Sequence, residues 1–494
     1  MSDAATIVLP VLVPIAAGIL LIALGRFPLL QRGGLVAGAA GTFLASVLLF
    51  ARVHGGGPLD VAFGGWEIPV GIAFHADLLS AIMVLVTGLV GFCTAWYACG
   101  EIGLVLWRRH YAFFFLLLLA GINGAFLTAD LFNLYVWFEV MLMASFAMMV
   151  LGRRKHTFEG ATKYVALNML SSFFFLCGLG LLYGKAGSLN LADVAARVSD
   201  TGSDPLLLTS ASLLLVAFGI KAGLFPLYFW LPASYPQTGF TTAAIFGGLL
   251  TKVGVYSIFR IFGSAFGFLS GFTAELFIWC GVLTMVAGVL GAASQFHLRK
   301  ILSFHIISQI GYLIFALGLF THGAVAAAIF YTAHHIIVKT NLFLAAGLIA
   351  RSGRSERLEK LGGLFRQQPL LALLFAIPAL SLGGIPPFSG FFAKFLVIRE
   401  SFLCGAYWLG ALALAVGVIT LFSMTKIWAE AFWKDSPRQT GLVRVPGGQM
   451  LPVALLAAAT IAIGLGVGPL FAIAQEAASQ LGFQAPSPTP TPTP

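Results

Sequence analysis

Four lysines of this sequence lie inside long apolar runs, where a positive charge is costly. Lys221 follows SLLLVAFGI and Lys252 interrupts FGGLLTKVGVY. Lys339 and Lys394 lie in HHIIVKTNLF and FFAKFLVI. A lysine at the centre of a membrane helix costs roughly 2.5–3.5 kcal/mol on insertion scales, and such residues generally mark a route for charge. The alternative is structural: a lysine paired with a carboxylate, or one that reaches the membrane interface.

One carboxylate lies as deep inside its apolar run as these lysines do in theirs. Glu139 lies in LFNLYVWFEVMLMASF, well inside an apolar run. A buried carboxylate needs a compensating partner, and we expect Lys221 to provide it. Two other lysines, Lys163 and Lys426, lie nearer the ends of their runs. Lys163 is expected to reach the interface, and for Lys426 that explanation and a functional role are equally good.

Three histidines extend the polar set. His305 lies in ILSFHIISQIGY, and His334 and His335 lie in YTAHHIIVKTNLF. His335 and Lys339 are four residues apart and would share one helix face. Histidine titrates near neutral pH, which suits a proton relay. The alternative is haem ligation by histidines of two helices, but membrane lysines have no use in a haem bundle.

Neither a metal site nor a cofactor is predicted. The five cysteines form no CxxC motif and no Cys/His cluster.

Two apolar runs contain residues that a regular helix does not tolerate. The first contains Gly223 and Pro226 in KAGLFP, and the second contains Gly384, Pro386 and Pro387 in SLGGIPPFSG. Proline removes a helix hydrogen bond and interrupts the helix. Paired interrupted spans in corresponding positions of two halves are typical of inverted-repeat transporters, with the ion site at the breaks.

The composition of the chain indicates a membrane protein. The chain of 494 residues is 59% hydrophobic and 9% charged, whereas soluble domains carry about 25% charged residues. Roughly fourteen runs are long enough to span a bilayer. They are 5–24, 34–51, 72–98, 111–128, 131–151, 162–184, 206–230, 240–262, 273–294, 301–320, 324–349, 370–398, 407–431 and 450–474.

The predicted fold is all-α and polytopic, with two inverted five-helix repeats. The repeats comprise spans 4–8 and 9–13, and spans 7 and 12 are broken. The predicted division is into N-terminal spans 1–3, a first repeat, a second repeat, a C-terminal span and a disordered Pro/Thr tail, at residues 1–110, 111–262, 263–431, 432–474 and 475–494.

The basic residues orient the chain. Most of them lie in one set of alternate loops, for example Arg108 with Arg109 and Arg299 with Lys300. Loops rich in Lys and Arg stay in the cytoplasm, so both termini are expected outside a bacterial plasma membrane. This distribution explains the net charge of +10 without nucleic acid.

Five motifs in order resemble the antiporter-like subunits shared by respiratory complex I and Mrp-type sodium/proton antiporters. They are KAGLFPLYFWLP, FGGLLTKVGVYSIFR, ILSFHIISQIGY, the HxxxK of His335 and Lys339, and GGIPPFSGFFAKF. The resemblance covers roughly residues 70–430 and is closest to D subunits of Mrp antiporters.

The resemblance implies a polar axis through the membrane centre. Glu139 would pair with Lys221, and Lys252 would connect two half-channels. His335 and Lys339 would continue the line, with Lys394 at its end. The implied partners are H⁺, Na⁺, lipid, and the large A and small C subunits of the complex.

Three functions remain open at this stage. The first is a proton-translocating subunit of a sodium/proton antiporter, a secondary transporter rather than an enzyme. The second is a proton-pumping subunit of complex I or a membrane-bound hydrogenase. The third is an inert scaffold, for which apolar residues would be cheaper than buried charges.

Overall fold

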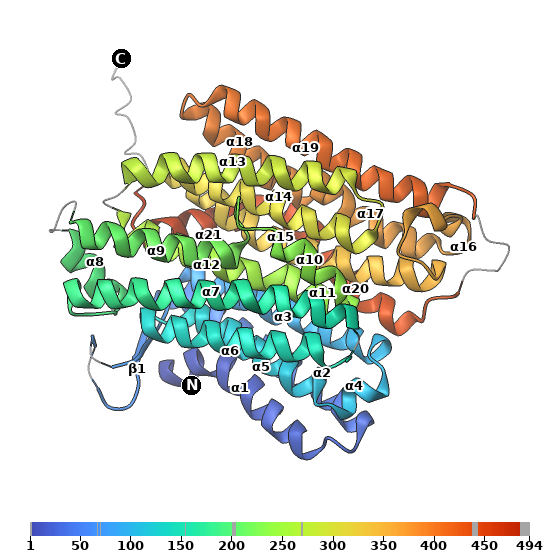
Figure 1. The fold of residues 1–494 in the computed structure, drawn as a ribbon, viewed down its shortest axis with the longest axis horizontal. Coiled ribbons are helices and arrows are strands. Elements are labelled where there is room, and N and C mark those ends of the chain that lie inside the picture. Colours follow the sequence, from blue (N-terminus) through green and yellow to red (C-terminus); the bar gives the residue numbers. More distant parts are fainter. Residues whose placement is uncertain are drawn as a thin grey trace.

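The protein is described here by a computed structural model, which covers residues 2–66, 68–69, 71–153, 155–199, 204–267, 270–436 and 443–484. Its long helices run side by side along one direction (Figure 1). The strand β1 (Leu59–Ala62) and the helix α8 (Leu191–Ser199) lie at one end of the bundle. The short helices α4 (Leu104–Arg108) and α16 (Leu364–Gln367) lie at the opposite end.

Twelve helices of the described residues are long and apolar enough to cross a membrane. They are α1 (Asp3–Ala23), α2 (Pro28–Gly56), α3 (Leu78–Glu101), α6 (Leu131–Val150), α7 (Lys155–Ala186), α9 (Pro205–Ala222), the run from α11 (Phe240–Ile245) through η2 (Phe246–Leu250) and α12 (Thr251–Arg260) to η3 (Ile261–Ala265), α13 (Ser270–Ser294), α14 (Leu298–Gly318), α15 (His322–Gly353), α19 (Tyr407–Trp428) with η6 (Ala429–Trp433), and α20 (Gly447–Leu465). Two shorter apolar helices are α5 (Tyr111–Leu127) and α17 (Pro369–Gly383). The predicted all-α, polytopic fold is confirmed.

The remaining elements are short or lie at the helix ends. They are β2 (Ala73–Ala76), α10 (Trp230–Ser234), η1 (Tyr235–Gln237), η5 (Leu358–Lys360), α18 (Ser389–Leu403) and α21 (Val467–Gln480). The strands β1 and β2 pair antiparallel, with Asp60 opposite His75.

Two predicted spans have different limits in the structure. The span expected from residue 72 begins as β2, and α3 starts only after Asp77, whose carboxylate accepts a hydrogen bond from the Ser80 N–H at 2.9 Å. The span expected at 450–474 is two helices, α20 and α21, which meet at Gly466. Glycine weakens a helix interior. Helix α21 then continues to Gln480, into the predicted tail, of which residues 485–494 lie outside the described residues.

Both predicted breaks share one backbone arrangement. Gly223 directly follows α9 and Gly384 directly follows α17. Their φ angles are 78° and 89°, a left-handed conformation that glycine adopts without a Cβ penalty. The N–H of Leu224 donates to Gly219 O at 2.9 Å, and the N–H of Ile385 donates to Leu380 O at 3.1 Å. These are the bonds of a Schellman helix end. Pro226 and the pair Pro386 and Pro387 follow in the two linkers, after which α10 and α18 resume.

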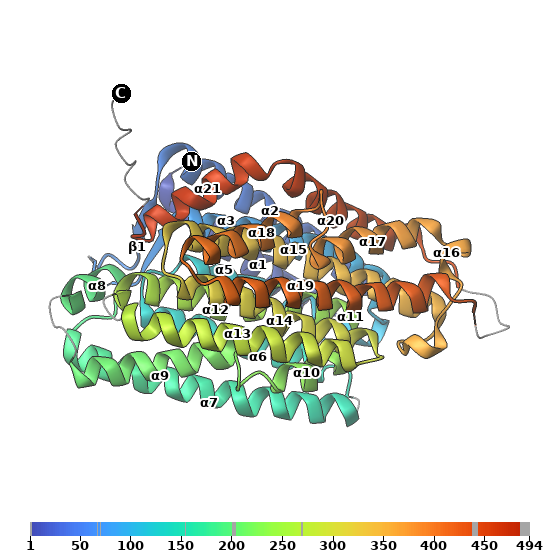
Figure 2. The same cartoon turned by 90° about the horizontal axis from the view of Figure 1, so that it is seen from above.

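Helix α15 lies at the centre of the bundle. It packs against α3, α11, α14, α17, α18, α20 and α21. Figures 1 and 2 both place it inside the layer of surrounding helices. Its polar side chains are therefore enclosed by protein.

Candidate functional site: a line of buried lysines and histidines

Three of the predicted residues lie on α15. His335 and Lys339 are fully buried, and His334 is 1% exposed. Lys339 Nζ donates to the backbone carbonyl of Leu302 on α14 at 3.3 Å. No hydrogen bond of the described residues reaches either ring nitrogen of His335. Both nitrogens are thus free of competing protein partners.

Lys252 reaches the same region from the neighbouring span. Its Nζ donates to Gly247 O at 2.6 Å, and the side chain is fully buried. Gly247 belongs to η2, a π-helical turn. Such turns are frequent at functional sites. The charges of Lys252 and Lys339 both act on the ring of His335, so these three residues form the middle of one polar line.

Lys394 lies beside the second helix break. Its Nζ is 3.4 Å from Gly383 O and 5.4 Å from the centre of the Tyr312 ring. A cavity of about 250 Å³ opens there, lined in part by Gly384, Lys394 and Gly417. The break therefore brings a backbone carbonyl and open space to the lysine.

Serines link His334 to the same break. His334 Nδ1 lies 2.7 Å from Ser389 Oγ, and that hydroxyl lies 3.2 Å from Ser381 Oγ. Ser389 begins α18 and Ser381 lies in the last turn of α17. Polar side chains thus continue from α15 to the interrupted span.

His305 faces α19 rather than α15. Its Nε2 lies 2.9 Å from Ser423 Oγ. One turn further along α14, Gln309 accepts a hydrogen bond from the Tyr331 hydroxyl at 2.5 Å. The sequence singled out His305 because an imidazole in an apolar run is rare. It missed Ser423, Tyr331, Ser172 and Ser389, because Ser and Tyr in membrane helices usually bond locally and give no distinct signal.

Glu139 and Lys221 lie in neighbouring spans but form no ion pair. The Glu139 carboxylate is half-buried and accepts a hydrogen bond from the Ser172 hydroxyl of α7. Lys221 is 8% exposed, and its Nζ lies 5.3 Å from the centre of the Phe138 ring. The carboxylate bonds to Ser172 here, while its charge still acts on Lys221 from the neighbouring span.

The central lysines form no close ion pair in the described part of the chain, although the charge of Glu139 acts on Lys221. None of the ion pairs of the described residues includes Lys221, Lys252, Lys339 or Lys394. Their acceptors are backbone carbonyls and aromatic rings, which compensate a buried charge less well than a carboxylate does. Each of these lysines can therefore give up its proton without breaking an ion pair.

No metal-binding group is visible in the part of the chain that the structure describes, since three or more His, Cys, Asp or Glu side chains nowhere come together.

A second buried charge cluster lies outside this line, at the start of α3. The guanidinium of Arg260 donates to both carboxylate oxygens of Asp77. It also donates to Ser80 Oγ at 2.8 Å and to Tyr256 Oη at 3.0 Å. Burial alone would raise the pKa of Asp77, but the charge and hydrogen bonds of Arg260 hold it well below its ordinary value. The sequence did not single out this pair.

Known proteins resemble this chain over nearly its whole length. A family described as NADH:quinone oxidoreductase/Mrp antiporter, TM matches residues 128–420. The D subunit of the Na(+)/H(+) antiporter of Alkalihalophilus pseudofirmus is 44% identical over 478 residues, which are 96% of this chain and 97% of that protein.

Solved structures agree. A chain of the Mrp complex from Dietzia sp. DQ12-45-1b has a TM-score of 0.89 and 32% identity, and the match covers 97% of both chains. A chain of the membrane-bound sulfane sulfur reductase, an archaeal respiratory membrane complex, has a TM-score of 0.87 and 27% identity over 97% of this chain and 98% of that one.

Fold and polar line together define a multi-pass membrane protein with ionisable groups at its centre. The chain belongs to the NADH:quinone oxidoreductase/Mrp antiporter family. The predicted family is confirmed. Its structural neighbours are chains of larger membrane complexes.

Proposed function

We propose that this chain is the D-type, proton-translocating subunit of a multisubunit Na⁺/H⁺ antiporter. The observation that carries the proposal is the line of Lys252, His335 and Lys339, which is fully buried and free of carboxylates. Its chemistry suits a proton that moves between neutral and charged bases. The similarity to the D subunit of an antiporter supports the same function.

Glu139 is the proposed switch. Burial favours a neutral lysine, whereas a nearby carboxylate favours a charged one. When Glu139 approaches Lys221, the lysine holds its proton. When Glu139 withdraws from Lys221, the proton of Lys221 can pass toward Lys252, and the hydroxyl of Ser172, which donates to Glu139, would hold the withdrawn carboxylate. Transfers through His335, Lys339 and Lys394 then complete the path, with His305 and His334 beside it.

The two helix breaks are the proposed water entrances from opposite sides. The inverted relation of spans 4–8 to spans 9–13 remains part of this proposal, as does the placement of both termini outside a bacterial plasma membrane. The relation between the two sets of spans is supported by the shared Schellman end at Gly223 and Gly384.

Sodium is proposed to cross elsewhere in the complex. A sodium site needs convergent oxygens, whereas lysine and histidine line the path here. The large A and small C subunits are the proposed neighbours that contact this chain.

The test uses inside-out vesicles from antiporter-deficient cells that express the whole complex. A pH gradient is formed across the vesicle membrane and sodium is added. The collapse of the pH gradient is then followed for the wild type and Glu139→Gln. We expect sodium-dependent collapse in the wild type and its loss in Glu139→Gln. The matched control is Glu159→Gln, because Glu159 is an exposed residue paired with Lys163.

The two possible failures have different meanings. If Glu139→Gln keeps full activity, the antiporter assignment stands and the switch is wrong. If the intact wild-type complex shows no sodium response, the antiporter assignment itself is wrong.

A redox-driven proton pump is the second candidate. It is favoured by the similarity to a chain of the sulfane sulfur reductase complex. Flavin or iron–sulfur proteins that co-purify with the chain would support this function, whereas small antiporter subunits would support the first.

A further inference from the structure

An imidazole lies between two carboxylates at the end of the bundle that carries β1. Asp60 of β1 stands opposite His75 of β2, and directly opposed side chains of paired strands are close neighbours. His75 Nδ1 lies 2.8 Å from Asp60 Oδ1, and His75 Nε2 lies 3.9 Å from Asp77 Oδ2. The side chains of Asp60, His75 and Asp77 are 58%, 33% and 1% exposed. The histidine thus joins the exposed hairpin to a buried charge.

Asp77 connects this histidine to the span that carries Lys252. Its Oδ2 atom, which faces His75, also accepts a hydrogen bond from Arg260 Nη1. The charges of Arg260 and His75 both act on this carboxylate. On α12, Lys252, Tyr256 and Arg260 recur at a spacing of four residues, so they share one face of the helix. Asp77 is therefore a common partner of the histidine and of the helix that positions Lys252.

Few other ionisable groups surround the imidazole. The elements that pack against β2 include β1, α3 and α5. The Tyr111 hydroxyl lies at the opposite end of α5. Asp130, in the connection from α5 to α6, accepts from the Asn133 N–H at 2.7 Å and caps α6. The charged groups that face His75, directly or through a shared partner, are Asp60, Asp77 and Arg260.

Protonation would give the imidazole a second donor that points at Asp77. A carboxylate only accepts hydrogen bonds, so the bond to Asp60 places the proton of the neutral ring on Nδ1. A protonated ring also carries a proton on Nε2. From the distance of 3.9 Å, an approach of about 1 Å would form a charge-assisted hydrogen bond to Asp77. That bond would use the same oxygen as Arg260 Nη1 does and would weaken its hold on Arg260.

We propose that His75 is a positioning residue for proton transport and makes its rate depend on the pH at this end of the bundle. The inference rests on the proposed function of the chain. Neutral His75 leaves Asp77 to Arg260, and the pair holds α12 where Lys252 can exchange its proton. Protonated His75 shares Asp77 with Arg260, and transport slows. In the proposed orientation, this end of the bundle faces the outside of the cell.

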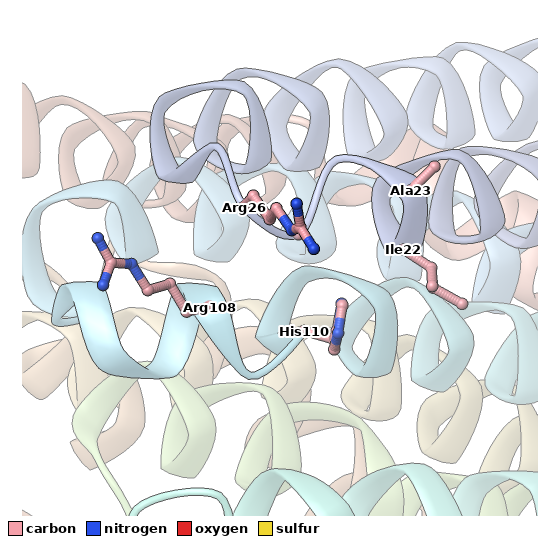
Figure 3. Close-up of a pocket in the computed structure, with 6 residues that line it drawn as sticks. Ile22, Ala23, Arg26, Arg108 and His110 are labelled. Carbon is pink, nitrogen blue, oxygen red and sulfur yellow. The ribbon is translucent and has the colours of Figure 1, made fainter.

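Two other histidines near the helix ends lack such carboxylates. His54 is exposed in the last turn of α2, and its ring stacks on Phe50 with 5.7 Å between the ring centres. His110 lies in a pocket of about 480 Å³ between the α1–α2 turn, α4 and α5, and no carboxylate lines this pocket. Figure 3 shows the Arg108 side chain directed away from His110. Because His54 is at the same end of the bundle as His75, it provides the matched control.

The test uses inside-out vesicles with the whole complex, whose interior corresponds to the outside of the cell. The interior is set to about pH 7.5 or about pH 5.5, which spans the titration of histidine. The external pH is kept constant, and uptake of radioactive sodium is measured per amount of assembled complex. The driving force is the same for all variants at each pair of pH values. The ratio of a variant's rate to the wild-type rate therefore isolates the effect of His75.

Two variants should reproduce the two charge states of His75. His75→Gln stays neutral, so its rate should equal that of the wild type at high interior pH. At low interior pH it should exceed the wild-type rate by up to about fivefold, because an ion pair of a partly exposed histidine is weak. His75→Arg stays charged, so it should be slower than the wild type at high interior pH and equal to it at low interior pH.

The control and the external pH sharpen the result. His54→Gln should follow the wild type at both interior pH values. When the external pH is varied instead, the ratio of His75→Gln to the wild type should stay constant. A change of this ratio with pH on both sides of the membrane would contradict a sensor at one end of the bundle.

Two results would overturn the inference alone. One is a ratio of His75→Gln to the wild type that is the same at both interior pH values. The other is a pH response of His75→Arg that matches that of the wild type, and it decides the question even if His75→Gln fails to assemble. A wild-type complex without sodium uptake at either pH would instead overturn the proposed function, and this inference with it.

Discussion

Two buried polar regions of this molecule differ in how their charges are compensated. At the start of α3, Asp77 meets Arg260 in a pair that Ser80 and Tyr256 complete. Along the central line, Lys252 and Lys339 bond only to backbone carbonyls, and no hydrogen bond of the described residues reaches His335. A complete charge pair holds one arrangement, whereas an incomplete one can change its protonation.

The compensated pair of Asp77 and Arg260 has a structural role, whereas the uncompensated central line suits proton transport. Asp77 ties α3 to α12, the helix that carries Lys252. The pair therefore fixes the position of the helix, and the uncompensated lysine on it is free to exchange a proton. The following variants test that division, from the largest expected effect on stability to the smallest.

Asp77→Asn should produce the largest loss of stability. It removes one partner of a buried ion pair and leaves the Arg260 charge uncompensated, which costs about 3–5 kcal/mol. Asparagine still caps α3 well, so the loss reflects the charge. The measurement is the thermal midpoint of the purified complex. A wild-type midpoint for Asp77→Asn would remove the distinction between the two regions.

Lys252→Met should affect stability little and transport greatly. Methionine has a similar volume and needs no partner, so stability should stay within about 1 kcal/mol of the wild type or increase. Sodium-dependent proton transport should fall at least about tenfold, because the line loses one of its bases. Lys163→Met, at an exposed residue of α7, is the control with normal transport. Normal transport in Lys252→Met would exclude this lysine from the path.

Asp60→Asn should produce the smallest change, and only above acidic pH. The hydrogen bond to His75, at 2.8 Å, lowers the pKa of Asp60 despite partial burial. A carboxyl with a lowered pKa stabilises the fold above its ordinary value of about 3.9, and this contribution disappears as pH falls through the lower folded value.

Because Asp60 is 58% exposed, the effect should stay below about 1 kcal/mol. The thermal midpoints of the wild type and Asp60→Asn should differ slightly at neutral pH and converge as the pH falls through the lowered pKa of Asp60. A difference that grows toward low pH would contradict this sign.

The sequence identified the ionisable residues of the central line but not their partners. Lys252, His335 and Lys339 were recognisable because charged and titratable groups are rare in apolar runs. Ser389 and Ser423 were not, since hydroxyls are common there. The pairing of Glu139 with Lys221 stays a prediction, because sequence places residues at a depth but not at a distance across helices.

The pair of Asp77 and Arg260 is a second example of a contact between distant segments that the sequence does not predict. Neither Asp77 nor Arg260 stands out in the sequence, because neither lies in a motif that indicates its partner. Pairing depends on contacts between distant segments, which no local pattern contains.

By itself, the sequence determined the membrane class, the approximate number of spans, the two interrupted helices and the unusual lysines. These follow from local physics: the length of apolar runs, the cost of a charge in lipid, and the backbone limits of glycine and proline. Only the tertiary structure decided which charges are compensated. That depends on distances of a few ångströms between helices, because electrostatic and hydrogen-bond energies fall off on that scale.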